Sequence, residues 1–401
     1  MKYSTIKLPL HGGHPPPYLI QRMVRLSASI SYVLINEYGQ HEFLRRLSDP
    51  LWFQAFGCVL GFDWHSSGVT TVVTGVLKQS LNECIHGISI AGGKGKKSME
   101  VKNEIPYFAE KHFNLSSNKI HELLYASKIA AKVDNAAIQD GYRLYHHTVF
   151  FDKDGNWTIV QQGMNNISNM ARRYHWLSDN LENFLCEPHT GIISDNKNSH
   201  TLNMTSIRSL ENQKICVELV NENISNLKSS VYRIQEIVKN IQKETSTLDL
   251  WMNKEHNIYD TENEKTEFKD NNIQDYLSLS KHYEMPRRID WNLFRKIYDI
   301  HPENYEDLIS IPGLGPSSVR ALSLIGELIY GTKASWQDPV KFNFAHGGKD
   351  GVPYPVARKS YDKSIKFLSS AIEGAEIKRE ERINALKKLS EYSHSLFDHD
   401  I

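Results

Sequence analysis

Residues 311–316, with the sequence IPGLGP, constrain the fold of this 401-residue chain more than any other stretch. Apolar residues at helical spacing lead into it over 305–311 and continue after it over 319–329. Glycine adopts backbone angles closed to other residues, and proline suits the first turn of a helix, where its missing N–H would have no partner. The stretch therefore predicts two helices joined by a tight turn, the arrangement of a helix-hairpin-helix element.

The start of the second helix in this hairpin is a predicted anion site. Free N–H groups and the helix dipole favour negative charge there, and a nucleic-acid phosphate is a suitable ligand. We expect contacts to the nucleic-acid backbone from Gly313, Gly315, Ser317 and Ser318, strengthened by Arg320. Such an element reads no base sequence, so any chemistry must come from another part of the chain. The alternative is a glycine turn that only joins two packing helices.

Composition and charge narrow the class of protein. No run of about 18 apolar residues is present, and the N-terminus MKYSTIKLPLHGG lacks the apolar core of a signal peptide. We therefore expect a cytoplasmic protein without a membrane partner. The four cysteines form no CxxC pair, which argues against a zinc knuckle or a disulfide scaffold. The formal net charge is zero, which argues against a strongly basic coat protein but is compatible with a locally basic groove.

We expect a mostly helical α+β fold in three parts. Residues 1–190 would form an N-terminal α+β domain that contains a β-hairpin and the candidate active site. Residues 191–285, rich in Asn and Glu, would form a helical arm and linker, and residues 286–401 the helix-hairpin-helix domain with its C-terminal helices. Within the arm, residues 207–247 carry apolar side chains near heptad spacing, which suits self-association.

The Asp-Gly pair at 154–155 predicts the β-hairpin, because alternating apolar residues flank it on both sides. In the register that follows, His147 faces Gln161 and His146 faces Gln162. Polar groups gathered at one end of a hairpin are costly to bury unless they bind a ligand or one another. This end of the hairpin is therefore a candidate site.

A glycine- and lysine-rich loop after the apolar stretch 87–91 is a second candidate for phosphate contact. It contains Lys94 and Lys96. The order of strand, loop and helix suits a phosphate cradle, but the spacing of a Walker A motif is absent. The alternative is a solvated basic loop.

Two further stretches contain candidate residues, and the sequence of each predicts a helix. Residues 118–145 predict one long helix with a polar face that includes Lys132, flanked by Asp134 and Asp140. Residues 171–178, with the sequence ARRYHWLS, predict a helix in which arginines would meet phosphate and aromatic rings would meet bases. For both stretches, the alternative is an ordinary mixture of core and solvated side chains.

Several longer motifs resemble a known family. They are LPLHGG (8–13), LSDP (47–50), WFQ (52–54), GFDWHSSG (61–68), KVDN (132–135), QQGMN (161–165), RRYHW (172–176) and AHGGKDG (345–351). On these motifs the chain resembles the prokaryotic family named "domain of unknown function 763", which is commonest in archaea. The resemblance covers nearly the whole chain except the Asn-rich middle. It implies no catalytic residues, because the family name leaves the activity unassigned.

The favoured function is a DNA-processing or repair enzyme, most simply a metal-dependent nuclease. Phosphodiester hydrolysis needs carboxylates for a divalent metal such as Mg²⁺ or Mn²⁺, a Lys or His for proton transfer, and Arg for phosphate. The candidates are Asp63, His65, Lys132, Asp134, Asp140, His146, His147, Gln161, Arg172, Arg173 and His175. Their spacing matches no nuclease signature, so the sequence assigns no metal ligands.

Two alternatives stay open. A DNA glycosylase of the helix-hairpin-helix class would place its essential aspartate after the hairpin, and Asp338 lies 25 residues beyond Gly313. Ser317 and Ser318 stand where the lyase subgroup carries lysine, so lyase chemistry is not expected. The second alternative is a non-enzymatic scaffold, whose polar clusters would be hydrogen-bonded to one another. All three functions share nucleic acid, with DNA favoured, as the partner.

Overall fold

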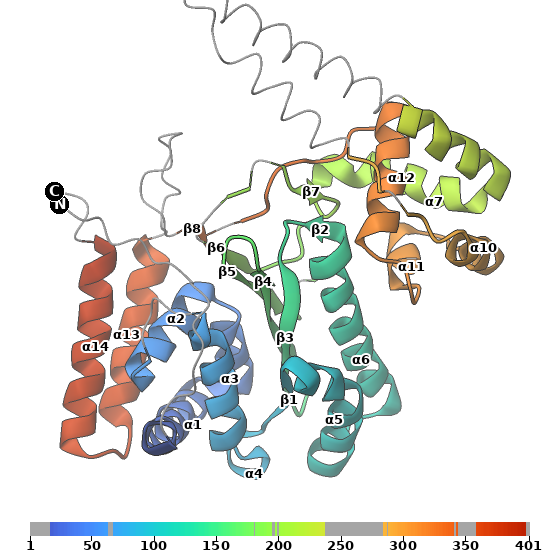
Figure 1. Cartoon of the computed structure of the whole chain (residues 1–401). Coiled ribbons are helices and arrows are strands. Elements are labelled where there is room, and N and C mark those ends of the chain that lie inside the picture. The colour runs from blue at the N-terminus through green and yellow to red at the C-terminus, as the bar shows by residue number, and fades with distance from the viewer. Residues whose placement is uncertain are drawn as a thin grey trace, which may run out of the picture.

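A six-stranded sheet of order β1-β3-β4-β5-β6-β8 lies between two groups of helices within the described residues (Figure 1). Its strands are β1 (Ile88–Lys94), β3 (Arg143–Asp152), β4 (Trp157–Asn165), β5 (Met170–Leu177), β6 (Gly191–Ser194) and β8 (Phe342–Asn343). Neighbouring strands are antiparallel except for the parallel pair β6 and β8. A separate antiparallel pair joins β2 (Ile138–Gln139) to β7 (Leu202–Asn203). The expected mostly helical α+β class is confirmed.

The computed structural model describes residues 17–62, 67–179, 181–194, 197–198, 200–236, 284–286, 288–340, 342–343 and 358–397. The expected sites at Asp63 and His65 therefore lie outside the described residues. Among the helices inside these ranges, none combines the length and apolar character that a bilayer crossing requires.

Helices from the two ends of the chain cover one face of the sheet (Figure 1). They are α1 (Pro17–Leu47), α2 (Pro50–Leu60), α3 (Gly68–Ser80), α13 (Arg358–Gly374) and α14 (Arg379–Phe397), with the short α4 (Glu83–His86) beside α1. Their buried apolar side chains form one core with Ile90, Phe150 and Val160 of the sheet. The N- and C-terminal regions thus fold onto each other.

Helices from the middle of the chain lie on the opposite side, where α5 and α6 pack on the sheet and the remaining helices extend the same core beyond α6 (Figure 1). They are α5 (Val101–Phe108), α6 (Ser117–Lys132), α7 (Leu210–Asn221), α10 (Trp291–Ile300), α11 (Tyr305–Ser310) and α12 (Pro316–Leu328), with 3-10 turns η1 (Gly95–Glu100) and η4 (Ile207–Ser209) and π-turns η2 (Ala109–Phe113) and η3 (Val133–Ala137). Their core includes Val149, Phe151 and Ile159, the sheet residues that alternate with those of the first core. This two-sided burial follows from the period of two along a strand.

The predicted β-hairpin and its register are confirmed. β3 and β4 pair His147 with Gln161 and His146 with Gln162. The prediction succeeded because turn chemistry and strand alternation are both local signals. Each pair faces a different helical layer: His147 and Gln161 lie on the α6 side, where His147 contacts Ser127, whereas His146 and Gln162 lie on the α3 side, where His146 contacts Thr74.

The predicted helix over 171–178 is wrong, because these residues form strand β5. Arg172 and Trp176 bond to Asp140 and Asp134 on one face of the sheet. Arg173 bonds to Gln54 on the other. A strand that buries polar side chains on both faces shows no simple alternation of polar and apolar residues, so the mixed composition resembled an amphipathic helix.

The predicted single helix over 118–145 is also wrong in its second half. α6 ends at Lys132, continues as the π-turn η3, and gives way to β2 at Ile138. Gly141 then takes a φ of 85°, in the left-handed region, before β3 begins. The apolar spacing continued past Lys132 because strand residues there pack into the same core.

The two cores do not follow the expected three-part division. One core draws residues from 91 to 340, and the other joins residues 23–90 and 367–389 to Phe150 and Val160 of the sheet. β6 of the expected arm pairs with β5, and α7 packs on α12, where Asn212 Nδ2 donates to the carbonyl of Ser323 (3.0 Å). The expected boundaries therefore do not separate independent cores, because β6 and α7 bury their apolar faces only by joining the rest.

The segment proposed for self-association uses its apolar side chains within the chain. Residues 207–236 are described and include α7 and a second helical stretch over 224–236. Leu219, Leu227 and Ile234 are buried in the core that also holds α12. Residues 237–247 of the segment lie outside the described residues, and self-association stays a prediction.

A buried ion-pair network joins the chain after α12 to the sheet. The Arg172 guanidinium donates to Asp140 Oδ2 (2.8 Å) and to both oxygens of Asp338 (2.9 and 2.7 Å). Tyr174 Oη also donates to Asp140 Oδ2 (2.6 Å), and all three ion-paired side chains are at most 1% exposed. A single arginine thus neutralises two carboxylates that would otherwise repel each other in a medium of low dielectric constant.

We predict that Arg172→Met destabilises the fold strongly, because it leaves Asp140 and Asp338 buried without their cation. Removing one partner of a buried pair costs on the order of 3–5 kcal/mol. Urea denaturation followed by circular dichroism measures the loss. Lys214→Ala, which breaks the exposed pair with Glu211, is the matched control and should leave the urea midpoint nearly unchanged. Equal midpoints for Arg172→Met and the wild type would contradict this role.

Candidate functional site

The structure distributes the predicted site residues over three places. Lys132, Asp134, His147 and Gln161 lie on the α6 side of the sheet. His146, Arg173 and His175 bond to the opposite layer of α1, α2 and α3, although His146 also lines the cavity described below. Arg172, Asp140 and Asp338 form the buried network already described. The sequence candidates therefore do not form a single cluster.

On the α6 side, four side chains form a continuous hydrogen-bonded chain. Ser127 Oγ lies 2.8 Å from His147 Nε2, and His147 Nδ1 lies 2.8 Å from Gln161 Oε1. Gln161 Nε2 donates to Asp134 Oδ2 at 2.6 Å. We call these residues the Ser127–Asp134 relay. α6 supplies the serine, β3 the histidine, β4 the glutamine and the turn η3 the aspartate.

The relay fixes the position of the histidine proton. A carboxylate only accepts, so the amide nitrogen of Gln161 must face Asp134 and its oxygen must face the ring. His147 Nδ1 therefore donates to Gln161 Oε1, and the neutral ring leaves Nε2 as an acceptor for the Ser127 hydroxyl. Burial lowers the pKa of His147, while the hydrogen bond that it donates to Gln161 and the charge of Asp134 act in the opposite direction. The ring is thus a neutral base toward Ser127.

Asp134 holds the far end of the relay. Besides Gln161, its carboxylate accepts from Trp176 Nε1 at 2.9 Å and from His189 Nε2. The Asp134 side chain is fully buried, as is nearly all of His189. Three N–H donors from β4, β5 and the segment before β6 thus compensate the cost of burying this carboxylate.

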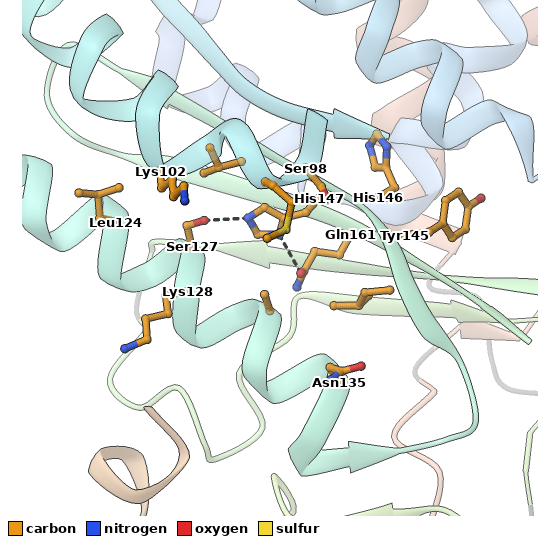
Figure 2. Close-up of a pocket in the computed structure, with 14 residues that line it drawn as sticks. Ser98, Lys102, Leu124, Ser127, Lys128, Asn135, Tyr145, His146, His147 and Gln161 are labelled. Atoms are coloured by element: carbon orange, nitrogen blue, oxygen red, sulfur yellow. Dashed lines mark hydrogen bonds between the residues drawn. The ribbon is translucent and has the colours of Figure 1, made fainter. Parts of the chain in front are cut away.

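The other end of the relay opens into a cavity of about 430 Å³ (Figure 2). The residues that line it come from η1, α5, α6, η3, β3 and β4: Ser98, Met99, Val101, Lys102, Leu124, Ser127, Lys128, Ala131, Asn135, Leu144, Tyr145, His146, His147 and Gln161. This set contains two lysines and no carboxylate, so the cavity suits an anionic ligand. Figure 2 shows Ser127 directed at His147, with Lys102 and Lys128 from α5 and α6 on either side in that view.

The turn between α11 and α12 rests on the same helix α6. Lys132 Nζ donates to the carbonyls of Ile311 (3.1 Å) and Leu314 (2.7 Å). Gln139 Nε2 donates to the carbonyl of Pro316 at 2.8 Å. Lys132, predicted as a catalytic residue, therefore binds the turn from beneath. Arg320, predicted to meet phosphate, donates through Nε to the carbonyl of Glu284 (2.9 Å).

The outer surface of this turn is open. Pro312, Gly313, Pro316 and Ser317 are exposed, whereas Ser318 is buried. Gly313 takes a φ of 92°, which favours glycine. α12 begins at Pro316 with Gly315 as its N-cap, and no side chain caps its first N–H groups. The first turn of this 13-residue helix therefore has no side-chain acceptor, and Pro316 and Ser317 within it are exposed.

The glycine- and lysine-rich loop differs from a phosphate cradle. β1 runs through Gly92 and Gly93 to Lys94 before the turn η1. The Gly92 N–H donates to Glu104 (2.6 Å), so this amide is not available to a ligand. The Lys94 ammonium lies 6.0 Å from the centre of the Tyr145 ring, and Lys96 is exposed. These lysines add positive charge near the cavity but do not line it.

The opposite side of the sheet holds a second buried polar cluster. Arg173 Nε donates to His175 Nε2 (2.8 Å), and its Nη2 donates to Gln54 Oε1 (3.0 Å). His175 Nδ1 donates to the carbonyl of Leu47 (3.0 Å), and burial lowers the pKa of this ring well below its ordinary value. These groups fix α2 to β5 and do not line the cavity.

The hydrogen bonds that Asp134 and Asp140 accept show whether these carboxylates are available to bind a metal ion. Asp134 accepts from three N–H groups, and Asp140 accepts from Arg172, from Tyr174 and from the Tyr142 N–H. Within the described ranges, no group of three or more His, Cys, Asp or Glu side chains could hold a metal ion. A metal on Asp134 or Asp140 would have to displace donors that the protein already supplies.

Sequence reasoning missed Ser127, His189 and Lys102. Ser127 sits among small residues of a helical stretch, and its partner His147 lies in another element. His189 follows a loop whose sequence carries no motif. The pairing of His147 with Gln161 was available from the hairpin register, and the helical spacing placed Lys132 on a polar face. The contact of His147 with Ser127 of α6 could not be predicted, because it depends on how α6 packs on the sheet.

We predict that His147 is neutral and carries its proton on Nδ1. Long-range ¹H–¹⁵N NMR spectra of the histidine rings should show this tautomer in the wild type at neutral pH. Gln161→Met removes the acceptor from Nδ1, so the ring should then populate both tautomers. His175, whose hydrogen bonds do not involve Gln161, is the internal control. An Nε2-protonated ring in the wild type would contradict the relay.

We also predict that His146 makes stability fall as pH decreases below neutral. Burial, with the charges of His147 and Lys94, lowers the pKa of His146 from 6.5 to about 3, and Nδ1 has no hydrogen-bond partner in the described part of the chain. The unfolded chain takes up a proton near pH 6.5, whereas the folded ring does not until about pH 3. The unfolded state therefore gains protons first, and stability is lost as pH falls through this window.

Urea denaturation at pH 7 and pH 5 tests this prediction by comparing the wild type with His146→Leu. The wild type should lose on the order of 2 kcal/mol more than the variant between these pH values. Other buried histidines contribute equally to both proteins, so the difference isolates His146. Equal losses would show that His146 is charged in the folded state or unshifted.

Comparison with known proteins gives one match. The family model described as "Protein of unknown function (DUF763)" matches residues 4–356. No curated protein and no solved structure matches the chain. The family match spans most of the sequence, including the relay, the cavity and the turn between α11 and α12. The chain belongs to the DUF763 family of proteins of unknown function.

Proposed function

We propose that this chain is a nucleic-acid-binding protein of the DNA-processing kind. In this proposal, the turn between α11 and α12 is a helix-hairpin-helix element that grips the backbone of nucleic acid, with DNA as the favoured partner. The cavity beside α6 receives the part of the bound strand on which the protein acts. A cytoplasmic location remains the expectation for such a protein.

The observation that supports this proposal is that α6 both holds the turn between α11 and α12 and lines the cavity. Lys132 holds the turn through two carbonyls, while Ser127, Lys128 and Ala131 of the same helix line the cavity. A backbone bound at the turn therefore lies next to the helix that forms one wall of the cavity. Helix-hairpin-helix elements position a strand without reading its bases, so a neighbouring pocket is where chemistry would occur.

The charges of the surface support an anionic partner. Lys102 and Lys128 border the cavity, and neither forms an ion pair within the residues that the structure describes. Free N–H groups at the start of α12 add a site for phosphate. The zero net charge of the whole chain is compatible with a local concentration of positive groups that carboxylates balance elsewhere on the molecule.

The favoured nuclease and the alternative glycosylase would each need a rearrangement of the described residues. A glycosylase that used Asp338 would have to separate a fully buried carboxylate from Arg172. A nuclease that bound metal through Asp134 or Asp140 would have to displace the N–H donors of these carboxylates. Asp63 and His65 lie outside the described residues, so a role for them in metal binding stays a prediction.

We predict that Ser317→Glu weakens DNA binding without weakening the fold. A carboxylate in the first turn of α12 favours the helix, because it interacts well with the positive end of the dipole, but it repels a phosphate at the same place. Fluorescence anisotropy with labelled single- and double-stranded DNA should show a loss in affinity of about tenfold and a smaller salt dependence.

Ser317→Ala is the matched control and should bind like the wild type, because only backbone groups of this residue are proposed to meet phosphate. Thermal melts of both variants verify the fold. Wild-type affinity in Ser317→Glu would exclude the turn as the contact. Absence of DNA binding by the wild-type protein would remove the proposed function altogether.

A further inference from the structure

We infer that Ser127 is a nucleophile and His147 its general base, and that their substrate is a phosphodiester of the nucleic-acid backbone. The choice of nucleic acid rests on the proposed function, whereas the activated serine rests on the relay alone. Gln161 and Asp134 act through His147 and are positioning residues in this proposal.

The hydrogen bond of Ser127 is unusual for a serine inside a helix. Such a hydroxyl commonly donates to the carbonyl one turn earlier. Ser127 Oγ instead bonds to His147 Nε2 at 2.8 Å, across two elements of structure. This is the distance and direction that a base needs to remove the hydroxyl proton as the oxygen attacks.

The ring of His147 is held for that role from its other side. Gln161 Oε1 fixes the proton on Nδ1, and the carboxylate of Asp134 fixes Gln161. When Nε2 accepts the serine proton, the resulting imidazolium keeps its hydrogen bond to Gln161 and lies near the negative charge of Asp134. The arrangement has the roles of a nucleophile, a base and an orienting group, with the carboxylate one amide further away.

The position of Ser127 makes its oxygen reachable by a ligand. The residue lines the 430 Å³ cavity although its relative exposure is 7%. Lys102 and Lys128 border the same cavity and can neutralise the charge that develops on phosphoryl oxygens during attack. A cavity lined by two lysines and no carboxylate suits a phosphodiester better than a neutral ester.

The proposed reaction has two balanced steps. Ser127 Oγ forms a bond to phosphorus, the bond from phosphorus to one sugar oxygen breaks, and the serine proton passes through His147 Nε2 to that leaving oxygen. Water then attacks the phosphoserine diester, His147 takes the water proton and returns it to Ser127 Oγ, and the serine–phosphorus bond breaks. The net change is hydrolysis of a phosphodiester to a phosphomonoester and an alcohol.

A fluorophosphonate probe tests the nucleophile on the full chain. Reaction forms a bond from Ser127 Oγ to phosphorus and releases fluoride, so intact mass and peptide mapping locate the label. We expect one label on Ser127 in the wild type, none on that peptide in Ser127→Ala, and labelling at least about 100-fold slower in His147→Gln. Ser117→Ala changes an exposed serine of the same helix and should label like the wild type.

Ser127→Ala removes only one hydroxyl and favours the helix, so a folding failure is not expected to obscure the result. Thermal melts and DNA binding verify this for every variant. An unlabelled Ser127 in a folded wild-type protein that binds DNA would overturn the nucleophile and leave the proposed function standing.

The substrate class is tested with bis(p-nitrophenyl) phosphate, p-nitrophenyl acetate and labelled DNA. Turnover of the phosphodiester, or a DNA adduct on Ser127 that survives denaturation, supports the proposal. Hydrolysis of the acetate ester alone overturns the phosphodiester assignment. A wild-type protein that is labelled on Ser127 but does not bind DNA would overturn the proposed function alone, whereas one that binds DNA but is not labelled on Ser127 would overturn the nucleophile alone. The two failures are thereby distinguishable.

Discussion

The buried carboxylate of Asp134 is the interaction on which the α6 side of the molecule depends. A carboxylate away from water is expensive unless its oxygens accept hydrogen bonds. Here the donors come from Gln161, Trp176 and His189 on three different segments of the chain. Satisfying one side chain therefore sets the positions of β4, β5 and the approach to β6 relative to the end of α6.

The Asp134 carboxylate also determines the donor and acceptor roles of His147 and Ser127, which it does not contact. Because the Asp134 carboxylate accepts a hydrogen bond, the amide N–H group of Gln161 faces it. The amide oxygen of Gln161 then accepts from Nδ1 of His147, so the proton of the ring lies on that nitrogen. The unprotonated Nε2 faces Ser127. Each step follows from the fixed donor and acceptor roles of the groups involved. The π-turn η3, which ends α6, is the local feature that turns Asp134 into the interior.

The parts of the fold that sequence could predict are those set by local chemistry. The Asp-Gly turn fixed the register of β3 and β4, and the glycine–proline pattern placed the ends of α11 and α12. β5 was missed because a strand buried on both faces, with arginines bonded on each, has no polar–apolar alternation to detect. Ser127 was missed because its significance lies in a contact with another element, and no local pattern reports such a contact.

The arginine and lysine candidates show the same limit. Arg172 and Lys132 were proposed as catalytic residues, yet Arg172 binds Asp140 and Asp338, and Lys132 binds the carbonyls of residues 311 and 314. Asp338 and the two carbonyls lie more than 150 residues away along the chain, so charge alone suggested phosphate. A cation in a sequence indicates that an acceptor exists, and only the fold tells whether that acceptor is a ligand or the protein itself.

Lys132 has one more consequence, which concerns the peptide planes of the turn. In a trans peptide the C=O of one residue and the N–H of the next point in opposite directions, and no cis bond occurs among the described residues. Because the ammonium group draws the carbonyl of Leu314 toward α6, the N–H of Gly315 is aimed away from α6 and out of the turn. Lys132, on the α6 side of the turn, thus orients the amide of Gly315 toward the opposite side. The positive charge and the N–H donor lie on opposite surfaces of residues 311–316.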